Sequence, residues 1–191
     1  MKLKNLIISA FIIVAFIQLY VPAKMILDNE DVIKTGTVYK FKTQPIDPND
    51  PFRGKYIVLR YEARNFKISN PNYWKRNEEV YVEFLINEDG YAKIKAITKK
   101  KPTHTSAYVI TKVDYVHNNS IGINYPFNRY YMEESKAYEA EVVYRDAQRD
   151  GLQTTYALVS IKNGAAVLKD VLINEVSIRE IVKQRQNSRK E

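Results

Sequence analysis

Residues 80–97 read VYVEFLINEDGYAKIKAI, and this stretch decides the fold class of the chain. Two runs of alternating apolar and polar residues flank Asp89-Gly90, a dipeptide that signals a hairpin between two such runs. Residues 155–172 repeat the arrangement around Asn163-Gly164. Strand chemistry alone accounts for this similarity, and an internal duplication is the alternative. The two hairpins predict an antiparallel β structure.

Short runs rich in β-branched and aromatic residues continue along most of the chain after Gly36. Tyrosine is frequent in them, as suits a pleated and half-buried surface. The expected strands are residues 37–44, 55–62, 80–87, 91–98, 107–116, 154–162 and 165–172. Because residues 55–62 are largely apolar on both faces, we expect them to form a central strand.

One segment departs from the β pattern and predicts a helix. Residues 133–150 contain no Gly or Pro, and they place three alanines and Tyr144 near one helical face. Gly151 would end the helix, although residues 142–144 could instead begin a strand. Residues 178–191 are basic and have few apolar side chains, so we expect a frayed helix or a tail there.

The N-terminal segment is apolar over residues 6–21 (LIISAFIIVAFIQLYV), and no charge lies between Lys4 and Lys24. As a helix, residues 5–23 would span about 28 Å, close to the hydrocarbon thickness of a bilayer. A buried core helix would show a polar face, and this run shows none. The segment predicts one membrane crossing. Residues 21–23 resemble a cleavage site, so a cleaved signal peptide is the alternative.

Charged residues on either side of the apolar segment predict its orientation. Lys2 and Lys4 precede it, whereas Asp28, Glu30 and Asp31 follow it. The positive-inside rule places the N-terminus in the cytoplasm and the rest of the chain outside the inner membrane, in the periplasm or another extracytoplasmic space.

These patterns together predict a mainly β protein of the β-rich α+β kind. A transmembrane helix comes first, followed by an antiparallel sheet or a partly open barrel with one helix. We expect a cytoplasmic stub and anchor at residues 1–24, a linker at 25–35, an extracytoplasmic β domain at 36–175 and a basic tail at 176–191.

Composition excludes several classes of site. The 191 residues include no cysteine and two histidines, so a disulfide scaffold, a thiolate metal site, a Cys nucleophile and a His-rich zinc site are excluded. His104 and His117 lie in separate polar segments that predict a loop and a turn. The net charge is +8, but the run at residues 99–101 lacks the interleaved aromatic residues of a nucleic-acid platform. The charge suits anionic headgroups or acidic envelope polymers, and we expect no cofactor.

The most distinctive stretch is residues 44–62, QPIDPNDPFRGKYIVLRYE. Three prolines recur at every third position, the period of a polyproline II helix, so the loop should be stiff. Asp47 and Asp50 share one ridge of that helix. Gly54 then precedes the expected strand, where it would supply a positive φ or a close backbone approach.

Residues 54–61, GKYIVLRY, are similar to the signature of the GDYXXLXY family of bacterial membrane-anchored proteins. Gly54, Tyr56, Leu59 and Tyr61 match that signature. A second block, Arg129, Tyr130, Tyr131 and Glu134, resembles the family's Arg, paired aromatic and acidic residues. The hairpin around Gly164 fits as well, and the resemblance covers most of residues 36–173 together with the anchor.

The resemblance implies location and architecture and leaves chemistry open, because the family has no established activity. It also implies a multi-span membrane protein as a partner. The family's Asp after the glycine is Lys55 here. An ammonium has no acceptor for a metal ion or a proton, so catalysis through this position is not expected.

The sequence contains two kinds of candidate catalytic group. Asp47 and Asp50 could act as an acid/base pair or hold a cation, and Arg53 could bind a carboxylate or phosphate. Asp before Pro is also ordinary turn chemistry, and an arginine in such a loop commonly forms an internal ion pair. Ser135 with Lys136, and Ser106 with Lys112, lack the context of a Ser/Lys nucleophile.

The leading interpretation is therefore a membrane-anchored interaction or structural module of the bacterial cell envelope. The rival interpretation is a hydrolase, or a small-ligand or cation-binding domain, that uses the loop with Asp47, Asp50 and Arg53. We expect the protein not to be an enzyme.

Overall fold

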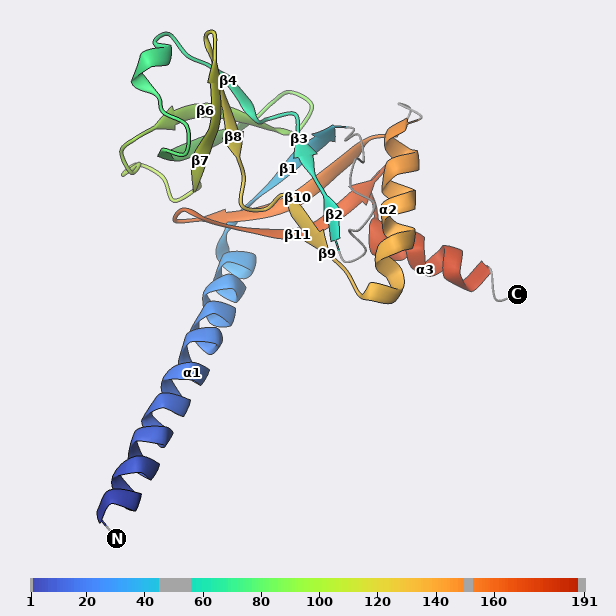
Figure 1. The fold of residues 1–191 in the computed structure, drawn as a ribbon. Helices are drawn as coiled ribbons and strands as arrows, with labels where there is room; N and C mark the ends of the chain where they lie inside the picture. The colour runs from blue at the N-terminus through green and yellow to red at the C-terminus, as the bar shows by residue number, and fades with distance from the viewer. Residues whose placement is uncertain (1, 45–55, 150–152, 189–191) are drawn as a thin grey trace.

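The computed structural model describes residues 2–44, 56–149 and 153–188, and it shows a long helix that stands away from a β-rich domain (Figure 1). The helices are α1 (Lys2–Thr35), α2 (Glu134–Arg149) and α3 (Ile178–Ser188), with a 3-10 helix η1 (Pro71–Tyr73). The strands are β1 (Thr37–Gln44), β2 (Tyr56–Val58), β3 (Arg60–Tyr61), β4 (Asn65–Lys67), β5 (Glu79–Ile86), β6 (Ala92–Thr98), β7 (Tyr108–His117), β8 (Ser120–Asn124), β9 (Arg129–Tyr131), β10 (Thr155–Lys162), β11 (Ala165–Ile173) and β12 (Val176–Ser177). The mainly β class with antiparallel sheets is confirmed.

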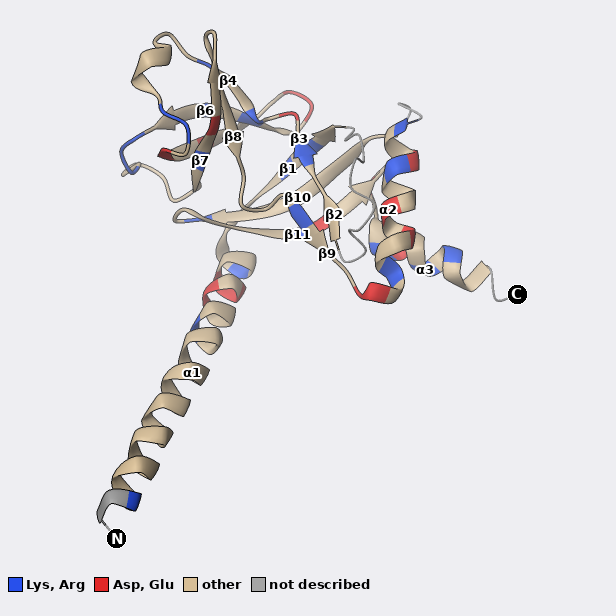
Figure 2. Ribbon diagram, viewed as in Figure 1, with Lys and Arg blue, Asp and Glu red and all other residues tan. Residues whose placement is uncertain are grey.

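Helix α1 runs unbroken through residues 25–35, which the sequence suggested as a linker. Its 34 residues correspond to about 51 Å. The helix is long and apolar enough to cross a membrane, and its apolar stretch is not buried inside the protein. Figure 2 shows that charged residues on α1 cluster next to the domain, above a long uncharged stretch. A helix that exposes apolar side chains all around suits lipid rather than water.

The first sheet has the strand order β12-β11-β10-β1-β3. Its centre is the β10–β11 hairpin, which turns at Asn163 (φ 50°) and Gly164 (φ 90°). Two successive positive φ angles are those of a type I′ turn, the hairpin connection that Asn-Gly favours. Strand β1 then pairs with β10 along six residues, which joins the start of the domain to its end.

The second sheet has the order β4-β8-β7-β5-β6 and curls into a partly open barrel. Its outer strands, β4 and β6, approach each other, but β4 pairs with β8 alone and β6 with β5 alone among the described residues. The expected hairpin at Gly90 (φ 83°) joins β5 to β6. We call the unpaired line between β4 and β6 the seam.

The expected central strand at residues 55–62 was wrong. The described part of it forms two short strands: β2 pairs with β9 in a separate two-stranded sheet, and β3 pairs with β1 at the edge of the first sheet. The burial explains the difference, because Ile57, Leu59 and Tyr61 are buried while Arg60 is exposed. The segment is thus one-sided, as an edge strand over a core should be.

Within the described residues the domain holds two α-helices, α2 and α3, where the sequence predicted one helix and a C-terminal frayed helix or tail. Helix α2 closely matches the predicted segment, and it buries the alanines and Tyr144 that the periodicity placed on one face. The basic C-terminal stretch forms α3, which packs against α2. Ile178 and Val182 of α3 are fully buried, so these apolar residues fix the helix to the domain.

One aromatic core joins the two larger sheets. Phe41 of β1 lies 5.0 Å from Phe84 of β5 between ring centroids, and 5.5 Å from Tyr61 of β3. Tyr125 and Phe127, on the connection from β8 to β9, complete the cluster. Side chains from both sheets therefore share one hydrophobic interior.

Helix α1 is fixed to the domain by a specific junction. Val32 is 5% exposed, and the Ser160 hydroxyl of β10 donates a 2.6 Å hydrogen bond to its carbonyl. The Lys162 ammonium contacts Asp31 and Thr35, each at 2.7 Å. Gly36 links helix to strand, and a Cβ there would lie 2.5 Å from the Val32 oxygen. The helix meets the domain through a packed, hydrogen-bonded contact.

Candidate functional site

Tyr56 of the signature and residues 129–131 of the second block come together in the two-stranded sheet. Tyr56 of β2 lies opposite Tyr131 of β9, and Val58 lies opposite Arg129. The two blocks recognised in the sequence are therefore neighbours in space. Glu134 begins α2 directly after them. The other candidate residues, Asp47, Asp50, Arg53, Gly54 and Lys55, lie outside the described residues.

The outer face of this small sheet is aromatic and basic. The Tyr56 and Tyr131 rings lie 5.3 Å apart between centroids, and the Arg129 guanidinium lies 5.0 Å from the centre of the Tyr56 ring. Hydrogen bonding with Tyr131, together with the nearby Tyr56, raises the pKa of Arg129. Tyr131 is 60% exposed. An arginine stacked on a half-buried tyrosine beside an exposed one is a typical contact surface.

The inner face of the same segment is structural. The Tyr61 hydroxyl donates a 2.7 Å hydrogen bond to the Phe127 carbonyl, and the Leu59 amide donates a 2.9 Å bond to the Asn128 carbonyl. Burial raises the pKa of Tyr61 well above its usual range, so this phenol stays protonated at neutral pH. Leu59 and Tyr61 thus hold the segment to the core and provide no reactive group.

Tyr130 connects this sheet to the C-terminal elements. Its hydroxyl donates a 2.7 Å hydrogen bond to the Asp170 carboxylate of β11, and the Arg179 guanidinium of α3 lies 5.3 Å from its ring centre. Burial, with a smaller effect of Asp170, raises the pKa of Tyr130. Asp170 and Arg179 were missed from the sequence because neither belongs to a motif.

A group of buried hydroxyl and amide side chains, also missed, lies where β1, β10 and α2 meet. Thr43 and Thr155 place their hydroxyl oxygens 2.6 Å apart. The Gln148 amide of α2 donates to the Tyr144 hydroxyl at 2.7 Å and to Thr43 at 3.1 Å. These hydrogen bonds satisfy one another and fix α2 on the first sheet.

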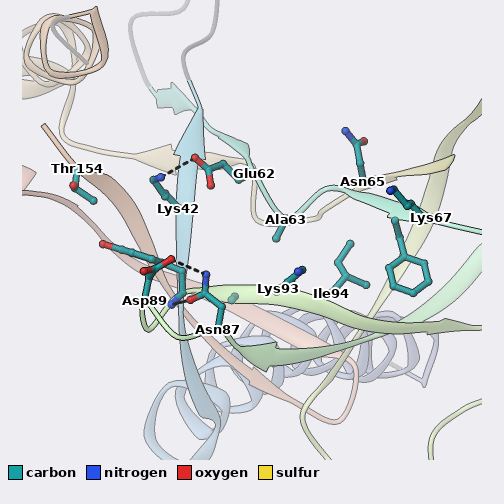
Figure 3. A pocket seen from close by; sticks show the side chains of 13 residues that line it. Lys42, Glu62, Ala63, Asn65, Lys67, Asn87, Asp89, Lys93, Ile94 and Thr154 are labelled. Atoms are coloured by element: carbon teal, nitrogen blue, oxygen red, sulfur yellow. Dashed lines mark hydrogen bonds and ion pairs between the residues drawn. The ribbon is translucent and has the colours of Figure 1, made fainter. Parts of the chain in front are cut away.

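The seam of the barrel opens into a cavity of about 900 Å³. Figure 3 shows Lys42 and Glu62 on one side of this cavity and Asn87 with Asp89 on another. Glu62 directly follows the signature residue Tyr61, so the signature segment leads into the cavity wall. Lys42 and Glu62 form a 3.1 Å ion pair, which neutralises both.

Two lysines on opposite edges of the seam have no carboxylate partner within the described part of the chain. Lys67 lies on β4 and Lys93 on β6, and both are exposed. Ala63, Phe66 and Ile94 form an apolar floor between them. The cavity is therefore a mixed site, apolar at its base and basic at its rims. No sequence motif marks it, because its walls come from separate sheets.

The remaining sequence candidates do not form a catalytic arrangement in the described residues. Lys136 forms a 2.8 Å ion pair with Glu133, which engages its ammonium away from a role as base for Ser135. His104 contacts the buried Glu83 at 2.9 Å. No group of three or more His, Asp or Glu side chains in residues 2–44, 56–149 and 153–188 could hold a metal ion.

The fold and the site define a class: a protein with one exposed apolar N-terminal helix fixed to an antiparallel β domain that has an open barrel seam. The chain belongs to the GDYXXLXY protein family, whose match covers residues 18–171. Comparison with curated proteins and with solved structures finds no match. The family assignment from the sequence blocks is therefore confirmed.

Proposed function

We propose that this chain is a single-pass membrane protein whose β domain serves as an interaction or structural module of the bacterial cell envelope. The observation that carries the proposal is the junction of α1. A helix suited to lipid continues into the domain and is fixed there by Val32, Ser160 and Lys162.

The part of α1 beyond the apolar stretch supports a role in positioning. Residues 24–35 are helical and correspond to about 18 Å. Ion pairs from Lys24 to Asp28 (2.6 Å) and from Glu30 to Lys34 (3.0 Å) follow the helical i,i+4 spacing. A stiff connection of this kind holds the domain at one height above the membrane, where it can meet a partner in the same bilayer.

We infer that the N-terminus is cytoplasmic and that the domain is periplasmic or otherwise extracytoplasmic. Lys2 and Lys4 precede the apolar stretch, and acidic residues follow it. The proposed partner is a multi-span membrane protein. The two surfaces that support contact are the stacked Tyr56, Arg129 and Tyr131, and the seam with Lys67 and Lys93.

Cysteine labelling tests the topology. Because the sequence contains no cysteine, an introduced cysteine is labelled without background from native thiols. Lys100 is exposed on the domain, and Asn5 precedes the apolar stretch, so Lys100→Cys and Asn5→Cys report on opposite sides of the proposed membrane segment. In spheroplasts, a membrane-impermeant maleimide should label Lys100→Cys at once and Asn5→Cys only after lysis. The reverse pattern would contradict the orientation, and a full-length soluble product would contradict anchoring.

Charge reversal tests the module. The double variant Lys67→Glu/Lys93→Glu should lose co-purification with the multi-span membrane protein that the wild-type chain retains in detergent. The double variant Lys100→Glu/Lys101→Glu makes the same change of charge at exposed positions away from the seam and should keep it. Equal retention by both variants would remove the seam from the proposed contact surface.

The hydrolase interpretation has its own test, since its three residues lie outside the described part of the chain. The double variant Asp47→Asn/Asp50→Asn should preserve the cellular phenotype if the chain is an interaction module. Loss of the phenotype with unchanged expression and membrane insertion would favour the hydrolase or cation-binding alternative.

A further inference from the structure

A second, smaller pocket of about 190 Å³ lies beside the signature segment. Its lining includes Leu59, Arg60, Tyr61, Arg64, Asn124 and Asn128. These residues come from β3 and the residues on either side of it, from the end of β8, and from the connection that follows β8. The pocket is distinct from the seam cavity, and the proposed function makes no use of it.

Hydrogen bonds hold the frame of this pocket on two sides. The Leu59 amide donates to the Asn128 carbonyl at 2.9 Å, and the Ile123 amide donates to the Arg64 carbonyl at the same distance. The Tyr61 hydroxyl adds its bond to Phe127. Because backbone contacts bind both walls to the core, the polar side chains project from a fixed support.

The charged side chains among the described lining residues are all positive. Two guanidinium groups and two carboxamides line the pocket, and no carboxylate is among its described lining residues. The Arg64 Nη2 atom forms a 2.6 Å ion pair with Asp114, outside the lining, which positions that guanidinium and balances its charge. Arg60 is exposed and has no carboxylate partner in the part of the chain that the structure describes.

Arg64 also retains an unused donor. Its Nε atom is buried and has no hydrogen-bond acceptor within the described residues. Leaving a buried donor unsatisfied is unfavourable, so such a group requires an explanation. An arginine binds a carboxylate or phosphate through two parallel N–H groups, but the Arg64 Nε is enclosed by protein, so an oxyanion in the pocket would reach it only after a shift of this side chain.

We propose that this pocket binds a small oxyanion, a phosphate or carboxylate group, between Arg60 and Arg64, with the amides of Asn124 and Asn128 as further donors. The volume of about 190 Å³ accommodates one such group and not a polymer. The group can belong to a free anion or to the end of a larger molecule such as a lipid headgroup. The shared chemistry is the oxyanion.

The test uses the full chain in phosphatidylcholine nanodiscs and isothermal titration calorimetry at constant ionic strength. The probes are inorganic phosphate, acetate and glycerol 3-phosphate. Saturable binding of at least one probe is expected for the wild type. Arg60→Gln should weaken that binding at least about tenfold, because it removes a charged hydrogen-bond donor from the site.

Arg76→Gln is the matched control, since Arg76 is an exposed arginine on another part of the domain. Its binding should equal that of the wild type. Tighter binding of glycerol 3-phosphate than of phosphate would assign the site to a headgroup, and the opposite order would assign it to a free anion. Absence of saturable binding by all three probes, or equal binding by Arg60→Gln and the wild type, would overturn the proposal.

Discussion

Tyr61 and Tyr56 illustrate how one short segment serves two purposes. Both belong to the signature, yet Tyr61 is buried with its hydroxyl on the Phe127 carbonyl, whereas Tyr56 stacks with Tyr131 on the outer face. Odd and even positions of an extended segment point to opposite sides. The offset of five residues between these two tyrosines therefore separates a core anchor from a surface group.

The buried hydroxyl of Tyr61 provides a stability test. Tyr61→Phe removes the donor and leaves the Phe127 carbonyl without its bond, which should reduce the free energy of unfolding by about 1–3 kcal/mol. Urea unfolding of the full chain in detergent, followed by Trp74 fluorescence, would measure the change. Tyr138→Phe, at a tyrosine that is 74% exposed, should stay within about 0.5 kcal/mol of the wild type. Similar losses in both variants would contradict the structural role of Tyr61.

Sequence reasoning identified the signature residues but not their roles. The match of Tyr56 and Tyr61 is visible in the sequence, whereas the pairing of Tyr56 with Tyr131 joins residues 75 positions apart. Nothing local encodes such a contact, because it depends on how the whole sheet closes. The same reason explains why Arg60 and Arg64 were not recognised as parts of one pocket.

At the scale of elements, α3 is the clearest difference between expectation and structure. Its polar composition suggested a frayed helix or a tail, because only a few apolar residues lie among many charges. Ile178 and Val182 are four residues apart and therefore share one helical face, which is sufficient to bind one turn against α2. Tertiary packing thus stabilises a helix that its composition alone does not predict.

This packing leads to a prediction about Ile178. Ile178→Ala should reduce the free energy of unfolding by about 2–5 kcal/mol, because the side chain is fully buried and its removal leaves a cavity. Val176→Ala, at a position that is 40% exposed, should have little effect. Thermal denaturation monitored by circular dichroism would compare the two. If Ile178→Ala has the same melting temperature as the wild type, α3 does not contribute to the stability of the fold.

The junction of α1 should weaken in acid. Hydrogen bonds from Lys162 and Thr35 lower the pKa of Asp31 below its ordinary value of 3.8. A carboxyl with a lowered folded-state pKa stabilises the contact above its unfolded value, and this contribution is lost as pH falls through the lowered pKa. We therefore expect the junction to loosen below about pH 4.

Spin labels at Leu27→Cys on the helix and Lys100→Cys in the domain would report this loosening as a broader distance distribution. Asp31→Asn should already be broad at neutral pH and respond less to acid. Asp28→Asn is the matched control, because Asp28 pairs with Lys24 within the helix and not with the domain. A distance distribution that stays narrow in Asp31→Asn would show that Val32 and Ser160 alone are sufficient to fix α1 to the domain.

Long elements were predicted well and short ones were not. The two hairpins have turn dipeptides and runs of seven to nine residues, so periodicity had room to appear. Strands β4, β9 and β12 have three, three and two residues, too few for any alternation to be read. Residues 25–35, predicted as a linker, continue α1, and their i,i+4 ion pairs support the helical conformation.

At the scale of the whole molecule, the proposed fixed height of the domain above the membrane is open to test. A flexible insertion of six Gly and Ser residues between Thr35 and Gly36 should leave the melting temperature of the domain nearly unchanged and abolish co-purification with the proposed membrane partner. A helical insertion of seven residues within 24–28 raises the domain by about 10 Å without adding a hinge. It should also reduce partner binding. Full binding by both insertions would show that height is irrelevant.

Because the junction at Gly36 is packed and hydrogen-bonded, a tilt of α1 also moves the domain. Transmembrane helices tilt when their apolar length exceeds the bilayer thickness, on average by about 20°. For the arm of about 18 Å formed by residues 24–35, which follow Pro22, such a tilt displaces the end next to the domain sideways by roughly 6 Å. A change in lipid composition that thins or thickens the bilayer would thus swing the domain across the membrane plane, and local lipid order would decide which neighbours it can reach.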